Sequence, residues 1–384
     1  MWNYGLGSLL IKTPFMKYPE NCLIYNYAQH YRLGVFKELD ATNDFHFYFG
    51  DKYRDVKKIN YKHLSGFVKE FRNIKIFKEV YFQFNSLETL FRPYNNYIIL
   101  GEYFCISTWI ILLSLKIFKG KKVYLWTHGY YGNESKLKYF VKDLFFSLAD
   151  GVFLYGNHSR EIMIKRKFNN QRLNVIYNSL NYKKSKSLRS QLVEKKIFYN
   201  YFKNLNPTIL FIGRLTKVKK LDMLLNVVHQ LGENSININL FIFGEGEIES
   251  SLRALSVKLD IVSNVFFYGA CYDEEIIAQH IYNSDIVVSP GNVGLTAIHS
   301  MSYGAPVITH SNMKNQMPES ESIIPGFSGD YFTEDDEIDL MSVIKNWLNF
   351  SKKNRKTIRE NCFQQIDSKF NPLYQKEIIL KALK

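Results

Sequence analysis

The pattern that most constrains the fold occurs twice along the chain: short apolar segments alternate with amphipathic helical segments. In the first half, strands are expected at 22–27, 45–49, 74–77, 97–100, 122–126, 151–155 and 174–177, and helices at 35–39, 136–148 and 159–167. Such alternation predicts a parallel sheet with helices on both faces.

The second half repeats the pattern from Thr208 onward. Strands are expected at 208–212, 237–243, 265–268, 286–289 and 306–309, and helices at 220–231, 248–259, 274–283, 295–303, 337–350 and 351–367. The chain of 384 residues is also too long for one ordinary domain. The fold class predicted is therefore α/β, with two Rossmann-like domains facing across a cleft.

The domain limits follow from the same pattern. We expect an N-terminal domain at 1–185, a linker at 186–206, a C-terminal domain at 207–365 and a final helical segment at 366–384 that packs back on the N-terminal domain. Ligands of doubly wound sheets bind beyond the carboxyl ends of the strands, so the cleft between the domains is the expected site.

Charge is distributed unevenly between the two halves. Residues 1–200 hold 32 Lys and Arg against 15 Asp and Glu, a net of +17, whereas the rest of the chain has a net of −3. This asymmetry indicates that the first half meets an anionic partner, although a generic solubilising charge is the alternative. Nucleic acid is disfavoured, because the basic residues are scattered and no recognised binding module is present.

The expected location is the cytoplasm, at the inner face of a membrane. The four cysteines are far apart and are interpreted as reduced, mostly buried thiols. Leu9–Ile11 is too short an apolar stretch for a signal peptide. The apolar stretch 97–118 is interrupted at Gly101-Glu102, so a strand, a turn and a buried helix are predicted there in place of a membrane span.

Glycine turns follow four strands of the second half. They are Gly213 before Arg214 and Leu215, the turn Gly244-Glu245-Gly246, the pair Tyr268-Gly269, and the run Gly291-Asn292-Val293-Gly294-Leu295-Thr296 before a helix. Glycine allows close approach of a backbone to a phosphate, and a helix N-terminus presents free N–H groups to an anion. Arg214 and Lys219 can neutralise a diphosphate. Four such turns in one domain predict a phosphate-bearing ligand.

On these residues, 208–309 resembles the donor-binding domain of the retaining family-4 glycosyltransferases, which have the GT-B architecture. The matching motifs are G-R-L with Lys219 and Asp222, the G-x-G turn, and P-G-N-V-G-L followed by M-x-Y-G-A-P-V-I. The first half is similar more weakly, through Trp126-Thr127-His128-Gly129 and the strands up to Ser179.

The resemblance implies roles for individual residues. Arg214 and Lys219 would hold the donor diphosphate, with backbone N–H groups near Gly294 and Leu295 assisting, and His128 would approach the donor sugar from the opposite domain. The remaining donor-side residues would be Gly213, Gly244, Glu245, Gly246, Tyr268, Gly269, Asn292, Thr296 and His299. No cofactor and no metal ion are expected.

Two acids of the family pattern are missing. In our alignment, the two glutamates that the family carries eight positions apart fall on Gly291 and His299. His299 can offer a single hydrogen bond to a hydroxyl or pack against the next strand, and Gly291 offers no side chain.

Each of the other candidate residues has a functional and a non-functional interpretation. Tyr31 and Arg32 are placed on the acceptor side, but a solvated Arg32 is equally compatible with the sequence. Glu319 and Glu321 could replace the missing acids, although surface glutamates are favoured. The acidic run 334–337 precedes a helix, where acids suit the helix dipole, and is rejected as a metal site.

The function predicted is that of a retaining, metal-independent hexosyl- or deoxyhexosyltransferase. The donor would be a nucleotide-diphosphate sugar and the acceptor a glycan or lipid-linked oligosaccharide at an anionic membrane, as in polysaccharide, lipopolysaccharide or capsule assembly. The alternatives are a catalytically silent glycosyltransferase-like partner subunit and a nucleotide-sugar epimerase, for which no paired acids are evident.

Overall fold

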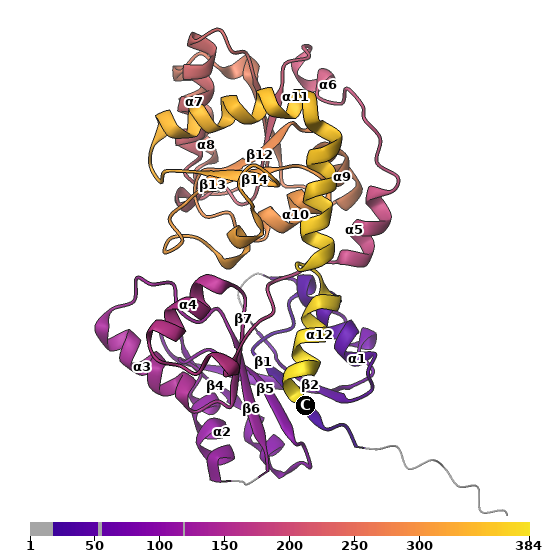
Figure 1. Cartoon of the computed structure of the whole chain (residues 1–384), viewed down its shortest axis with the longest axis vertical. Coiled ribbons are helices and arrows are strands. Elements are labelled where there is room, and N and C mark those ends of the chain that lie inside the picture. Colours follow the sequence, from indigo (N-terminus) through magenta and orange to yellow (C-terminus); the bar gives the residue numbers. More distant parts are fainter. Residues whose placement is uncertain (1–17, 53–55, 118–119) are drawn as a thin grey trace, which may run out of the picture.

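The computed structural model describes residues 18–52, 56–117 and 120–384. Leu9–Ile11, considered above as a signal sequence, lies outside the described residues. The described chain forms two α/β domains, one above the other in Figure 1. Each contains a mainly parallel sheet with helices on both faces, which confirms the predicted fold class.

The N-terminal domain is built on an eight-stranded sheet in the order β4-β3-β2-β1-β5-β6-β7-β8. Its strands are β1 (Asn21–Tyr25), β2 (Phe45–Gly50), β3 (Phe67–Phe77), β4 (Val80–Phe84), β5 (Asn96–Leu100), β6 (Lys122–Thr127), β7 (Gly151–Leu154) and β8 (Leu173–Val175). Its helices are α1 (Leu33–Asp40), α2 (Ile106–Ile117), α3 (Lys136–Ser147) and α4 (Asn157–Lys165). Only β3 and β4 pair antiparallel among the described strands.

The C-terminal domain has a six-stranded parallel sheet in the order β11-β10-β9-β12-β13-β14. Its strands are β9 (Thr208–Ile212), β10 (Asn239–Phe243), β11 (Val265–Gly269), β12 (Ile286–Ser289), β13 (Val307–His310) and β14 (Gly329–Phe332). Its helices are α7 (Leu221–Glu233), α8 (Glu249–Lys258), α9 (Glu274–Asn283), α10 (Thr296–Ser302) and α11 (Glu337–Ser368). Two helices, α5 (Tyr182–Arg189) and α6 (Tyr199–Phe202), lie between the sheets in the sequence.

The last helix returns to the first domain. Helix α11 crosses the C-terminal domain, bends at Asn354, where the backbone is not helical, and leads into α12 (Pro372–Leu383) beside α1 (Figure 1). Ile379 of α12 is buried in the N-terminal core, and Lys376 forms an ion pair with Glu38 at 3.0 Å. The two domains are therefore joined by two crossings of the chain.

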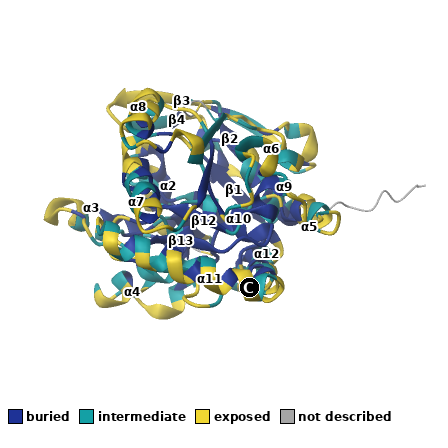
Figure 2. Cartoon of the chain, turned by 90° about the horizontal axis from the view of Figure 1, so that it is seen from above, coloured by how far each residue is buried: buried dark blue, intermediate teal, exposed yellow. Residues whose placement is uncertain are grey.

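One core cluster fills the C-terminal domain and two fill the N-terminal domain, and in Figure 2 the buried residues lie inside and the exposed ones outside. The stretch 97–118 forms β5, a turn and α2 as far as the structure describes it, but the prediction of a buried helix is wrong for one face of α2, which exposes Ile106, Ile110, Leu113 and Ile117. Of the helices that the structure describes, none combines the length and hydropathy that a membrane-spanning helix requires.

Candidate active site between the two domains

Lys219 lies where the loops after β9 and β12 meet. Its Nζ donates to the backbone oxygen of Asn292 at 2.5 Å and to Asn292 Oδ1 at 2.9 Å, and the amide of Gly291 donates to the Lys219 oxygen at 3.1 Å. Burial, together with the nearby charge of Arg214, lowers the pKa of Lys219 to about 8. A lysine in this position is a protonated, partly desolvated cation at neutral pH.

Arg214 is exposed at the end of β9 and is supported by a tightly packed pair of glycine turns. Gly244 has φ 143°, and a Cβ added there would lie 1.9 Å from the oxygen of Gly213, so only glycine allows this contact. The amide of Leu215 donates to the backbone oxygen of Glu245 at 2.9 Å, which fixes the second turn, ending at Gly246, against the first; the Glu245 side chain is exposed. The structure thus brings Gly213, Arg214 and the Gly244–Gly246 turn together.

Helix α10 begins next to these turns. Thr296 Oγ1 donates to the oxygen of Ile212 at 3.0 Å, which ties the helix to the end of β9. Gly294 has φ 55°, and no side chain caps the helix at Leu295. The first amide groups of α10 therefore lie near Lys219 and Asn292, as a phosphate site requires.

His299 forms a hydrogen bond that the sequence did not predict. Its Nε2 lies 2.8 Å from Glu274 Oε1, which also accepts from the Tyr303 hydroxyl at 2.6 Å. Burial would raise the pKa of Glu274, but the bonds from His299 and Tyr303 lower it to about 2. His299 and Glu274 line a hollow of about 410 Å³ together with Tyr31 and Leu295. The sequence predicted His299 as the only polar side chain here, whereas the structure adds the carboxylate of Glu274 from α9.

Tyr268 and Gly269 end β11, and they do not line this hollow, which begins at Cys271 of the following loop. The Tyr268 ring packs against Phe243 at 4.7 Å between centroids and against Tyr201, as part of the rim of the core. Tyr272, which is 90% exposed, is the aromatic side chain of this loop that lines the hollow.

Gly291 has no room for a side chain. A Cβ there would lie 1.9 Å from the oxygen of Val218 and 2.8 Å from the Cα of Lys219. The backbone that carries Lys219 therefore fills the place of the missing acid.

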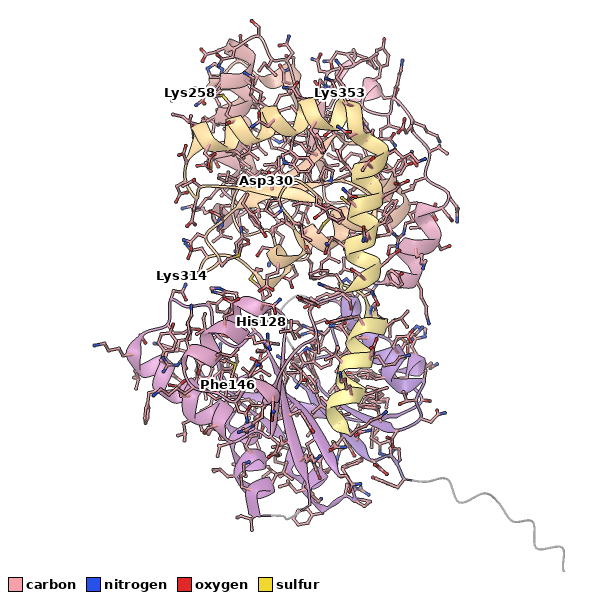
Figure 3. The ribbon with its side chains drawn as sticks, in the orientation of Figure 1. His128, Phe146, Lys258, Lys314, Asp330 and Lys353 are labelled. Atoms are coloured by element: carbon pink, nitrogen blue, oxygen red, sulfur yellow. The ribbon has the colours of Figure 1, made fainter. Side chains whose placement is uncertain are left out.

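His128 faces the C-terminal domain from the end of β6. Figure 3 shows it at the top of the N-terminal domain, below Lys314. Its ring contacts Tyr155 at 4.6 Å and stacks on Tyr131 at 6.2 Å between centroids. Burial, with the charges of Arg32 and Lys142, lowers the pKa of His128 to about 3, so its imidazole is neutral at physiological pH. Its Nδ1 has no hydrogen-bond partner among the described residues.

Tyr31 lines the same hollow as His299, whereas Arg32 points into the protein. The interpretation of Arg32 as a solvated side chain is wrong: it is 7% exposed. Its guanidinium lies over the rings of Tyr155 at 5.0 Å and Tyr25 at 5.3 Å, and its Nε and Nη1 have no hydrogen-bond partner among the described residues. The aromatic rings compensate part of the desolvation of this cation.

Glu319 and Glu321 do not lie on the surface, and that interpretation is wrong. Glu319 is 3% exposed, and its Oε1 accepts from Asn178 of the N-terminal domain at 2.7 Å. Glu321 accepts from the amides of Asn157 at 2.6 Å and His158 at 2.7 Å, so it caps the first turn of α4 from the opposite domain. Burial raises the pKa of both carboxyl groups. They join the domains at the centre of the cleft.

The acidic run 334–337 has other partners. Glu334 and Asp335 form ion pairs with Lys220 at 3.0 and 2.6 Å, and Asp336 caps α11. Among residues 18–52, 56–117 and 120–384, no group of three or more His, Cys, Asp and Glu side chains is arranged to hold a metal ion.

Residues 193–364 match the family model described as glycosyl transferases group 1. This segment contains all six strands of the C-terminal sheet and makes up less than half of the chain. The whole described fold is similar to the lipopolysaccharide outer core galactosyltransferase WaaB, at 16% identity and a TM-score of 0.70 over 94% of this chain and 98% of that one. It is also similar to Anabaena HepE in complex with UDP, at 15% identity and a TM-score of 0.68 over 95% and 99% of the two chains. These findings support a GT-B glycosyltransferase.

The sequence relatives match over shorter parts of the chain. An uncharacterized 41.2 kDa protein of the cps region of Klebsiella pneumoniae is 23% identical over 61% of this chain, and an uncharacterized glycosyltransferase of Methanocaldococcus jannaschii is 27% identical over 52%. The chain spans 63% and 51% of the lengths of these relatives.

Proposed function

We propose that this protein is a retaining, metal-independent glycosyltransferase of family 4, with a nucleotide-diphosphate sugar as donor. The observation that carries the proposal is the position of Lys219, held by Asn292 beside Arg214 and the start of α10, at the mouth of a group 1 domain. Negative charge develops on the departing diphosphate as the glycosidic bond breaks. Cations and helix amides arranged beforehand stabilise that charge without reorganisation.

The proposal extends to the two substrates. UDP complexes of a fold neighbour support a uridine nucleotide as the first donor to test. Arg214 and Lys219 supply the charge for which other transferases use a metal ion. Since none of the carboxylates in the described part of the chain is an evident nucleophile, we propose attack on the same face as the departing phosphate. A hexosyl or deoxyhexosyl group would pass to a glycan or lipid-linked acceptor held on the N-terminal side, near His128, at an anionic membrane.

One observation favours a second candidate, a catalytically silent partner subunit. Gly291 cannot carry the acid of the family pattern at this position, because the backbone of Val218 and Lys219 occupies its place. A silent subunit would bind the nucleotide without turnover, so UDP release from a UDP-sugar by the purified chain distinguishes the two functions.

The donor class can be tested by thermal stabilisation. We expect the melting temperature to rise with UDP or one UDP-sugar in a panel of nucleotides and nucleotide sugars, since a ligand at 100 times its Kd stabilises a protein by about 2.7 kcal/mol. EDTA should leave that rise and the transfer activity unchanged. No response to any nucleotide sugar would contradict the proposal, and loss of activity in EDTA, restored by Mn²⁺, would contradict metal independence.

The His299–Glu274 pair gives a second test of the donor site. We expect His299→Ala and Glu274→Ala each to weaken UDP binding by about 1–2 kcal/mol. Each variant removes a hydrogen-bonding group from the hollow, and the remaining member of the pair loses the bond that positions it. Isothermal titration of UDP measures the change.

A matched control is available on α7. His229 and Glu233 form a similar pair at 3.6 Å on the helix surface, so His229→Ala should not change UDP affinity. If His299→Ala left UDP affinity unchanged and strongly lowered the melting temperature of the empty protein, His299 would be a packing residue only.

A further inference from the structure

Helix α2 carries an apolar stripe on its outer face. Ile106, Ile110, Leu113 and Ile117 recur at helical spacing and are 38, 37, 53 and 79% exposed. The opposite face buries Ile111, Leu112 and Leu115 in the N-terminal core. The helix is thus apolar all round although only one face is needed for the core.

Helix α3 repeats this arrangement beside it. Leu137, Phe140 and Leu144 are 73, 67 and 50% exposed, while Phe145 and Phe146 are buried. The two helices touch through Trp109 and Phe145, whose rings lie 4.9 Å apart. They connect consecutive neighbouring parallel strands, β5 to β6 and β6 to β7, so they cover the same face of the sheet.

The two stripes continue onto the neighbouring segments. Helix α2 packs against β4 and the 3-10 turn Ser86–Phe91, where Phe84 is 51% and Phe91 85% exposed. We call this surface the α2–α3 face; it consists of Phe84, Phe91, Ile106, Ile110, Leu113, Ile117, Leu137, Phe140 and Leu144. Isolated exposed apolar residues are ordinary, but a row of this length on adjacent elements marks an interaction surface.

The charges of the α2–α3 face are basic. The two helices carry four lysines and one aspartate. Lys142 is buried and paired with Glu134, Lys116 is paired with Asp150, and Asp143 is paired with Arg166. Lys136 and Lys138 are exposed beside Leu137, and Arg92 is exposed beside Phe91. Interfaces between proteins are depleted of lysine, whereas lysines around apolar side chains are typical of segments that lie in a lipid interface.

We propose that the α2–α3 face docks on an anionic lipid surface, with its apolar side chains in the acyl boundary and its lysines at the head groups. The opposite side of the sheet offers no such surface at α1, because α12 covers that helix. The amino ends of α2 and α3 follow β5 and β6, and the loop of His128 begins at the carboxyl end of β6. The cleft therefore opens at the edge of the docked face. This inference deepens the proposed function, since it places a lipid-linked acceptor beside the candidate site.

The test is flotation of the full-length chain with phosphatidylglycerol-rich vesicles and with phosphatidylcholine vesicles. Binding is expected to the anionic vesicles only and to weaken in high salt. The triple variant Leu137→Ser, Phe140→Ser, Leu144→Ser should bind these vesicles at least about tenfold more weakly than the unmodified protein. The matched control is Val257→Ser, Val262→Ser, Ile338→Ser, which removes three exposed apolar residues of the C-terminal domain and should bind unchanged.

Three outcomes would overturn this inference: equal binding of both triple variants, equal binding to both kinds of vesicle, or a dimer in sedimentation that only the α3 variant dissociates, without vesicle binding. Stabilisation by UDP, measured on the same proteins, should be the same in all variants. Vesicle binding without stabilisation by UDP would contradict the proposed function but not the docking face. Stabilisation by UDP without vesicle binding would contradict the docking face but not the proposed function.

Discussion

Lys219→Ala is expected to lower transfer from a nucleotide sugar by about 10²-fold or more, since loss of one prearranged donor to developing charge costs about 2.7–4 kcal/mol. Arg214→Ala should have an effect of similar size. The loss should fall mainly on kcat/KM, because the cations act on the diphosphate as it departs. Steady-state kinetics with a saturating acceptor measures it.

The control for this variant lies two residues away. Lys217 belongs to the same 3-10 turn, Lys217–Lys219, but is exposed to solvent, so Lys217→Ala should retain full activity. Full activity in both Lys219→Ala and Arg214→Ala would show that the diphosphate lies elsewhere.

The pKa of Lys219 adds a dependence on pH. Because it is lowered to about 8, Lys219 of the empty site loses its charge as the pH rises through that value, and Arg214 remains as the only one of the two cations. UDP affinity should therefore fall between pH 7 and pH 9. Lys219→Arg keeps a cation over this range, since a guanidinium does not deprotonate, and should flatten the pH profile. An identical profile in the two proteins would assign the pH dependence to another group.

Much of the fold could be predicted from periodicity alone. Strands β9 and β12 and helix α9 have the predicted limits, because each is an apolar or amphipathic run that ends at a turn residue. The hairpin of β3 and β4 was seen only in part and β14 was not predicted. Charged residues interrupt β3, β4 is mostly half-buried or exposed, and β14 has only four residues, so none of them stands out as a buried strand.

The site was less accessible to sequence reasoning. Glycines and cations that follow strands could be found, since each leaves a local pattern. Glu274 could not, because its partner His299 is 25 positions away and the pairing depends on how α9 packs beside α10. Glu319 and Glu321 were misjudged for the same reason: their partners belong to the opposite domain. Contacts across a domain boundary leave no periodic signal in either segment.

Gly291→Ala is expected to destabilise the protein and disable the donor site together. The added Cβ would lie 1.9 Å from the oxygen of Val218, so the segment that carries Lys219 must move. Such overpacking costs about 1–3 kcal/mol. The same movement separates Lys219 from Asn292, which now accepts at 2.5 and 2.9 Å. We therefore expect a lower melting temperature and, in the fraction that folds, UDP binding that is weaker by a factor similar to that of Lys219→Ala.

Gly232→Ala is the matched control, since no heavy atom lies within 4 Å of a Cβ added at this position of α7. Alanine in a helix is favoured over glycine by about 0.5–1 kcal/mol, so this variant should melt at the same or a higher temperature and bind UDP normally. The comparison separates the loss of a glycine from the loss of this particular contact. If Gly291→Ala melted like the unmodified protein and bound UDP normally, Val218 and Lys219 would have room to shift. The absence of an acid at Gly291 would then have no steric cause, and Gly291→Glu would become a feasible route to the acid that the family carries there.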